Sequence, residues 1–190
     1  CLLAGAAPAA QPAEAVYVVT YLEVRSADVD AGAALARQYV RDSRTDAGNV
    51  AADAFEEIDR RERFLLVASW HDRPALRAHE TAAHTLEFRR RLGAIHRSPE
   101  VSLVNYGFSI DPRGVPGAPG ALYVVTHVDV LKVAHQQTEA LLAPLAATSR
   151  SAHGNIRYDV YEEFGEGGNH FNLFAIWNGR SDFDAYQDAP

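Results

Sequence analysis

Residues 17–20 read Tyr-Val-Val-Thr, and residues 123–126 repeat the same four letters. The correspondence continues at a constant spacing of 106 residues, and at 107 after a one-residue insertion in the second copy. Other equivalent pairs are Ser43 and Ser149, Gly48 and Gly154, Phe64 and Phe171, and Trp70 and Trp177. A repeat of this length indicates two copies of one folding unit, which determines domain number and element order together.

The first copy carries strand and helix signals in a definite order. Residues 16–24 are rich in β-branched and aromatic side chains, as strands are, and Gly48 is placed to end the helix that follows. Asp72 and Pro74 mark the start of a second helix. The expected elements are a strand at 16–24, a helix from 26 or 28 to about 46, strands at 50–58 and 63–71, a helix from 72 to about 92, and a strand at 101–110.

This β-α-β-β-α-β order is that of the ferredoxin-like unit, so the sequence predicts an α+β fold with two such units in tandem. The first domain is expected at residues 16–111 and the second at 121–190, joined by a Pro- and Gly-rich linker at 112–120. The second copy lacks a counterpart of the last strand of the first, and we expect it to be incomplete at its C-terminal end.

Charge and hydropathy argue against some classes of partner. The 190 residues carry a formal net charge of −7 and contain no long run of Lys or Arg, which argues against binding to nucleic acid or to an anionic membrane surface. No apolar stretch approaches the length of a membrane span. The composition is that of an ordinary soluble globular protein.

Residues 1–15 are first apolar, then small and Pro-rich, like the tail of a secretory signal peptide. An exported protein, periplasmic or secreted, is therefore expected. A lipidated Cys1 and the low-complexity leader of a cytoplasmic protein are the alternatives. Cys1 is the single cysteine of the chain, which fits a protein without disulfides.

A strand that ends at Trp70 is followed by a helix with an Ala78-His79 pair, a second histidine at His84 and an aromatic residue at Phe88. This arrangement resembles the antibiotic biosynthesis monooxygenase family. The resemblance implies a dimeric-type α+β barrel, made here by the two fused copies as an intramolecular pseudo-dimer, with further homo-oligomers left open. It also implies oxygenation of a small phenolic or quinol-type aromatic substrate by O2 without a metal, flavin or haem cofactor.

Such chemistry needs an aromatic wall, a proton acceptor and a donor for a developing oxyanion. His79 and His84 are candidate bases, because imidazole titrates near neutrality, and Trp70 is a candidate wall with an N–H donor. The competing interpretations are a core aromatic for Trp70 and partly exposed helix-surface histidines for the other two. Expected substrate contacts are Tyr21, Phe64, Leu66, His127, Trp177 and Tyr186.

His79 and His84 flank Glu-Thr-Ala-Ala, which is close to the zinc-binding pattern His-Glu-x-x-His. Five residues of regular helix turn the second histidine about 140° from the first, which predicts that the two do not share an ion and that the site holds no metal. In the second copy the His79 position is Tyr186, and a phenol is a poor base at pH 7. One working site is therefore expected, in the first copy.

Two other functions stay open. The haem-degrading monooxygenases of the same superfamily also resemble this chain in a strand Trp followed by a helical His, here Trp70 and His79. Those enzymes use an Asn on the first strand, where this chain has Thr20 and Tyr21. A non-catalytic barrel that binds a small ligand is the other alternative, and the loss of a base at Tyr186 favours it for the second copy.

Overall fold

The computed structural model describes residues 15–113, 117–165 and 169–189. The chain divides into two compact units, called below the first half (described residues 15–105) and the second half (described residues from 106 to 189). All of the expected leader except Ala15, and residues 114–116 of the expected linker, lie outside the described residues.

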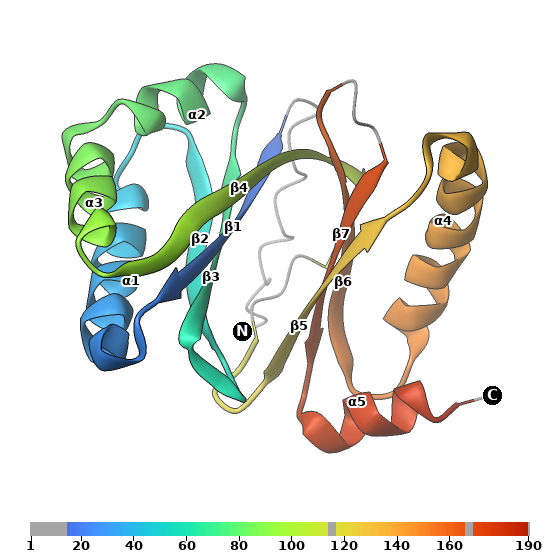
Figure 1. Cartoon of the computed structure of the whole chain (residues 1–190). Helices are drawn as coiled ribbons and strands as arrows, with labels where there is room; N and C mark the ends of the chain where they lie inside the picture. The colour runs from blue at the N-terminus through green and yellow to red at the C-terminus, as the bar shows by residue number, and fades with distance from the viewer. Residues whose placement is uncertain (1–14, 114–116, 166–168, 190) are drawn as a thin grey trace, which may run out of the picture. The chain divides into compact units, whose positions relative to one another are not determined.

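The first half contains the predicted order of strands and helices, with its second helix split in two (Figure 1). Its strands are ordered β2-β3-β1-β4, and β1 pairs antiparallel with β3 from Val16 opposite Trp70 to Glu23 opposite Arg63. The elements are β1 (Val16–Val24), η1 (Ser26–Asp28), α1 (Val29–Ser43), β2 (Asn49–Glu57), β3 (Arg60–Trp70), α2 (Arg73–Glu80), α3 (Ala83–Gly93) and β4 (His96–Ser109), whose residues from Tyr106 onward belong to the second half.

Helices cover one face of this sheet (Figure 1), because apolar side chains alternate along its strands. Leu22 of β1 lies opposite Phe64 of β3, and both are buried in the core with side chains of α1 and α3. Gly32 lets α1 approach the sheet, since a Cβ at this position would lie only 3.0 Å from Cε2 of Phe64. The helical residues of this core are Ala33, Leu35, Ala36, Val40, Phe88 and Leu92.

The single helix expected from residue 72 to about 92 is wrong, because α2 ends at Glu80 and α3 begins at Ala83. The expected start is confirmed: the Asp72 side chain accepts a hydrogen bond from the backbone N–H of Ala75 at 2.8 Å. The Thr81 hydroxyl bonds the carbonyl oxygens of Arg77 and Ala78 at 3.3 and 3.1 Å, and Ala82 has extended backbone angles. A threonine that hydrogen-bonds the preceding turn competes with the helix, and the chain changes direction here.

The second half repeats the architecture with the strand order β6-β7-β5, and the end of β4 lies beside β6. Leu122 lies opposite Trp177, as Val16 lies opposite Trp70. The elements are β5 (Leu122–Asp129), η2 (Lys132–Ala134), α4 (His135–Ser151), β6 (Asn155–Glu163), β7 (His170–Trp177) and α5 (Arg180–Gln187). The predicted fold class, α+β with tandem ferredoxin-like units, is confirmed. No helix within the described ranges is long and apolar enough to cross a membrane.

Candidate active site

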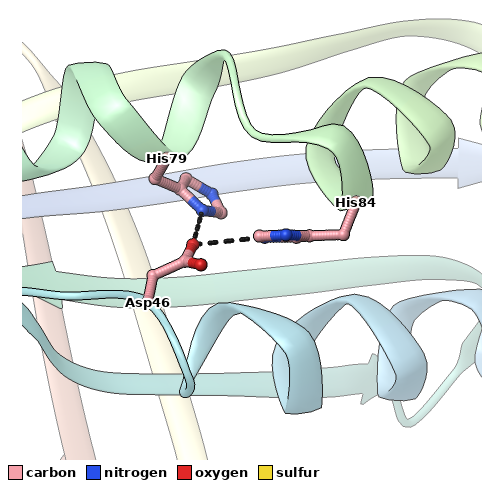
Figure 2. A group of neighbouring side chains, drawn as sticks. All are labelled: Asp46, His79 and His84. Atoms are coloured by element: carbon pink, nitrogen blue, oxygen red, sulfur yellow. Dashed lines mark hydrogen bonds and ion pairs between the residues drawn. The ribbon is translucent and has the colours of Figure 1, made fainter.

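His79 lies in the last turn of α2, and Figure 2 shows the Asp46 carboxylate on one side of its ring. Nδ1 is 2.7 Å from Oδ2 of Asp46, which sits in the turn after α1, and Nε2 is 2.7 Å from the hydroxyl of Tyr39 on α1. The histidine is only 6 % exposed. The interpretation of His79 as a helix-surface residue is therefore wrong.

The hydrogen bonds select one tautomer of His79. An ionised carboxylate can only accept a hydrogen bond, so Nδ1 carries the proton and donates to Asp46. Nε2 is then the free base and accepts from the Tyr39 hydroxyl. Burial lowers the pKa of His79, an effect that the Asp46 carboxylate opposes. The ring is thus a neutral base at pH 7, oriented by a carboxylate as in hydrolase triads.

His84 is brought to the same carboxylate by the break between α2 and α3 (Figure 2). Its Nε2 is 3.2 Å from Oδ2 of Asp46, yet this buried atom has no aligned hydrogen bond within the described residues. The argument that 140° of helix separates the two histidines is wrong, since no continuous helix joins them.

Aromatic rings enclose His79. The Trp70 ring, at the end of β3, lies 4.4 Å from the His79 ring between centroids and is 1 % exposed. Phe88 of α3 stacks on Tyr39 at 4.0 Å. These rings keep water from the imidazole and so produce the burial that lowers its pKa.

Tyr39 keeps its proton at neutral pH. Burial raises its pKa to about 12, while a hydrogen bond from Thr85 and the positive charge of Arg89 act in the opposite direction. The Thr85 side chain is fully buried. Tyr39 is therefore a neutral phenol that can donate to His79 or pass a proton to it.

A cavity of about 60 Å³ opens beside this group, between the helices and the sheet of the first half. A buried water needs about 10–15 Å³ of such space, so the cavity has room for about four to six waters. The polar residues that line it are Thr20, Tyr39, Ser43, Asp53, His79, Glu80, Arg89 and Ser102. The apolar residues that line it include Val18, Leu66 and Trp70.

The three residues of the first half that were expected to contact substrate lie in three different environments. Leu66 lines the cavity. Phe64, two residues earlier on β3, packs in the core with Gly32 and is not among the residues that line it. Tyr21 follows Thr20 on β1 and so points to the opposite face of the sheet, because side chains alternate along a strand.

The expected residues of the second half form two groups of their own. Trp177 is fully buried with its ring 4.6 Å from that of Tyr186, whose hydroxyl is 2.6 Å from Oγ of Ser149. His127 lies on β5 and bonds Asn172 at 3.1 Å and Asp129 at 2.9 Å. His79, His84, Trp70 and Leu66 are the predicted residues that the fold brings together.

Tyr39, Asp46, Thr85 and Arg89 were missed by the interpretation of the sequence. The repeat contains a signal that points to two of them. At the positions equivalent to Tyr39, Asp46 and His79 the second copy has Leu145, Ala152 and Tyr186. Ser43, close to them in the sequence, is retained as Ser149. Tyr39, Asp46 and His79 are joined by hydrogen bonds, and all three differ between the two copies. This joint difference indicates that they act as one unit.

Asp46, His79 and His84 also form one of three groups that could hold a metal ion among the described residues. The other two are His127 with Asp129 and His170, and His135 with Glu139 and Glu162. In the first group the 2.7 Å separation of His79 and Asp46 is that of a hydrogen bond. The third member, His84, has its Nε2 at 3.2 Å from the same carboxylate oxygen.

The sequence profile of a family described as "Antibiotic biosynthesis monooxygenase" matches residues 15–91 and again residues 121–190. No curated protein matches the chain.

Three solved structures match almost the whole chain. A candidate monooxygenase from Lactobacillus acidophilus NCFM is 12 % identical to this chain, with a TM-score of 0.73. The match covers 93 % of this chain and 83 % of the Lactobacillus chain. One from Fusobacterium nucleatum subsp. nucleatum is 15 % identical with a TM-score of 0.74, covering 93 % and 82 %. An anthrone oxidase-like protein is 15 % identical with a TM-score of 0.72, covering 93 % and 78 %. At these identities the likeness establishes the fold, which in all three extends over both halves.

Proposed function

Because the chain belongs to the antibiotic biosynthesis monooxygenase family, we propose that its first half oxygenates a single-ring phenol or quinol with O2, using His79 as the base. The observation that carries the proposal is the neutral, buried imidazole of His79. It is fixed by Asp46 on one nitrogen and presents the other toward Tyr39 beside the cavity.

The substrate hydroxyl gives its proton to Nε2 of His79, directly or through the Tyr39 hydroxyl. The imidazolium that forms is stabilised by Asp46. The phenolate is electron-rich and transfers an electron to O2, after which a C–O bond forms at the ring. Burial by Trp70 keeps water away from this anion. The guanidinium of Arg89 lines the cavity and stabilises negative charge on the bound oxygen.

The overall reaction of a quinol balances without an outside reductant. One oxygen atom of O2 stays on the ring, while the O–O bond breaks and the second atom leaves as water with two hydrogens of the substrate. The ring supplies all the electrons and is oxidised to a hydroxyquinone. His79 returns its proton to the departing oxygen and is neutral again for the next turnover.

The size of the cavity favours a small substrate. Its volume of about 60 Å³ is below the roughly 150 Å³ of a cavity that encloses benzene, so a single ring would occupy it only in part, with Val18, Leu66 and Trp70 as the apolar contacts. A tricyclic substrate would need a much wider cavity. A haem is much larger, and this volume argues against the haem-degrading alternative.

The test is oxygen uptake with benzene-1,4-diol in the presence of a chelator, with autoxidation subtracted. We expect one O2 per quinol, one labelled oxygen in the product from ¹⁸O2, and loss of both signals in His79→Ala. Binding of the quinol without turnover would identify the protein as a ligand-binding barrel instead. Turnover that survives His79→Ala would show that another group is the base.

A further inference from the structure

The second half contains a group of three ionisable side chains that play no part in the proposed reaction. His135 and Glu139 lie one turn apart on α4 and so share a face of the helix. Glu162 reaches the same place from β6, and the three ligand atoms lie within 4.8 Å of one another. The separations from Nε2 of His135 are 3.5 Å to Glu139 and 3.3 Å to Glu162.

Glu162 is the unusual member of the group. Its side chain is 5 % exposed, and Oε2 is buried without a hydrogen-bond partner among the described residues. The carboxylate also receives a hydrogen bond from Tyr106. A buried carboxylate costs several kcal/mol unless a cation or further donors surround it. The fold therefore presents Oε1 of a buried carboxylate to His135 and leaves Oε2 of the same group without a hydrogen-bond partner in the described part of the chain.

The distances fit a shared ion better than direct hydrogen bonds. Hydrogen bonds between imidazole and carboxylate measure about 2.7–3.2 Å. Two ligands of a tetrahedral zinc ion, each at about 2.0–2.1 Å, lie about 3.4 Å apart. The 3.3 and 3.5 Å separations match the second value. In the two other groups, by contrast, histidine and aspartate are already hydrogen-bonded at 2.7 and 2.9 Å.

The first half lacks this group. At the positions equivalent to His135 and Glu139 it has Val29 and Ala33, which pack against the apolar core. Its counterpart of Glu162 is the exposed Glu56, which pairs with Arg61 at 2.8 Å. The second half has thus gained an imidazole and a carboxylate next to a carboxylate that both copies share.

We propose that His135, Glu139 and Glu162 bind a divalent first-row transition metal ion, of which Zn²⁺ is the reference case. One imidazole nitrogen and two carboxylates are a donor set that such ions accept. His135 and Glu139 are partly exposed, which leaves a path for the ion and an open coordination position for water. The proposal does not depend on the oxygenation chemistry, because it uses none of the residues that line the cavity.

The test uses Co²⁺ as a spectroscopic probe of the full chain. We expect a tetrahedral visible absorption band at one ion per chain, displaced by Zn²⁺ but not by Mg²⁺. Glu162→Gln and His135→Val should each weaken binding by about tenfold or more, since each removes a ligand. The matched control is Glu56→Gln in the first half, which should leave the band unchanged.

A second measurement guards against misfolded variants. Zn²⁺ should raise the melting temperature of the wild-type protein, and this rise should disappear in Glu162→Gln even if that variant folds. Binding that is equal in the wild type and in both ligand variants would overturn the proposal. An absence of binding by the wild type would also overturn it.

Discussion

Asp46 and His79 are separated by 33 positions in the sequence, yet Oδ2 of the first and Nδ1 of the second lie 2.7 Å apart. The bond joins the turn after α1 to the last turn of α2, and it decides which nitrogen of the ring is basic. Substitutions of these two residues and of their neighbours test the proposed site.

Asp46→Asn should lower kcat about 10²- to 10⁴-fold, the usual contribution of general acid–base catalysis. An amide can donate to Nδ1 and so move the imidazole proton to Nε2, which abolishes the base. Steady-state oxygen uptake measures the effect. Asp30→Asn, at an exposed carboxylate on α1 that does not line the cavity, is the control and should keep most of the activity. Equal losses in both variants would contradict the assignment.

Activity should fall as the pH is lowered through the pKa of His79, because protonation removes the base. Since burial lowers that pKa below its ordinary value of 6.5, activity should persist to a more acidic pH than a free imidazole would allow. The pH profile of kcat/KM provides the measurement. An acidic limb of this profile centred at or above pH 6.5 would contradict the lowered pKa of His79.

The same shift has a consequence for stability. A histidine whose folded pKa is depressed stabilises the fold fully above its unfolded pKa, and this contribution is lost as the pH falls from about 6.5 toward the folded value. Urea unfolding of the wild type should therefore show a loss of stability between pH 7.5 and 5.5 that is smaller in His79→Gln. An identical pH dependence in the two proteins would show that His79 is not the group responsible.

Trp70→Phe and Trp177→Phe form a matched pair at equivalent positions of the repeat. Both are buried, and each loss of ring volume should cost about 1–3 kcal/mol. Only Trp70 contacts the candidate base, so only its replacement should reduce kcat and alter the pH profile. Comparable kcat values for the two variants would assign Trp70 to the core alone.

Gly48→Ala should impair both stability and turnover. Gly48 has φ of 81°, and a Cβ there would lie 2.6 Å from Cβ of Ala75 at the start of α2. The strain should cost about 1–3 kcal/mol and displace α2 from Asp46. Gly154→Ala, where a Cβ would overlap Asp182, should destabilise similarly and spare turnover. Thermal unfolding and oxygen uptake together separate the two effects.

The repeat was sufficient to predict the order of strands and helices along each half and to single out Trp70 with its equivalent Trp177, because these signals lie close together in the sequence. His79 was singled out by the family resemblance. Asp46 was missed because it lies in a turn, and its role comes from a distant contact. Tyr21 was expected in the site. Side chains alternate along a strand, however, so Thr20 faces the cavity and Tyr21 faces the other side of the sheet. The meeting of His79 and His84 was excluded on the premise of a continuous helix, which Thr81 interrupts.

The hydroxyl of Tyr186, 2.6 Å from Ser149, stands in the second half at the position that His79 has in the first. A tyrosine–serine bond carries no charge and needs no carboxylate partner, so the second half does without the buried polar network of the first. If the first half carries the proposed reaction, the duplication separates two selective pressures that usually act on one domain. One copy then keeps the geometry of the reaction, and the other is free to diverge toward stability or to acquire a new ligand.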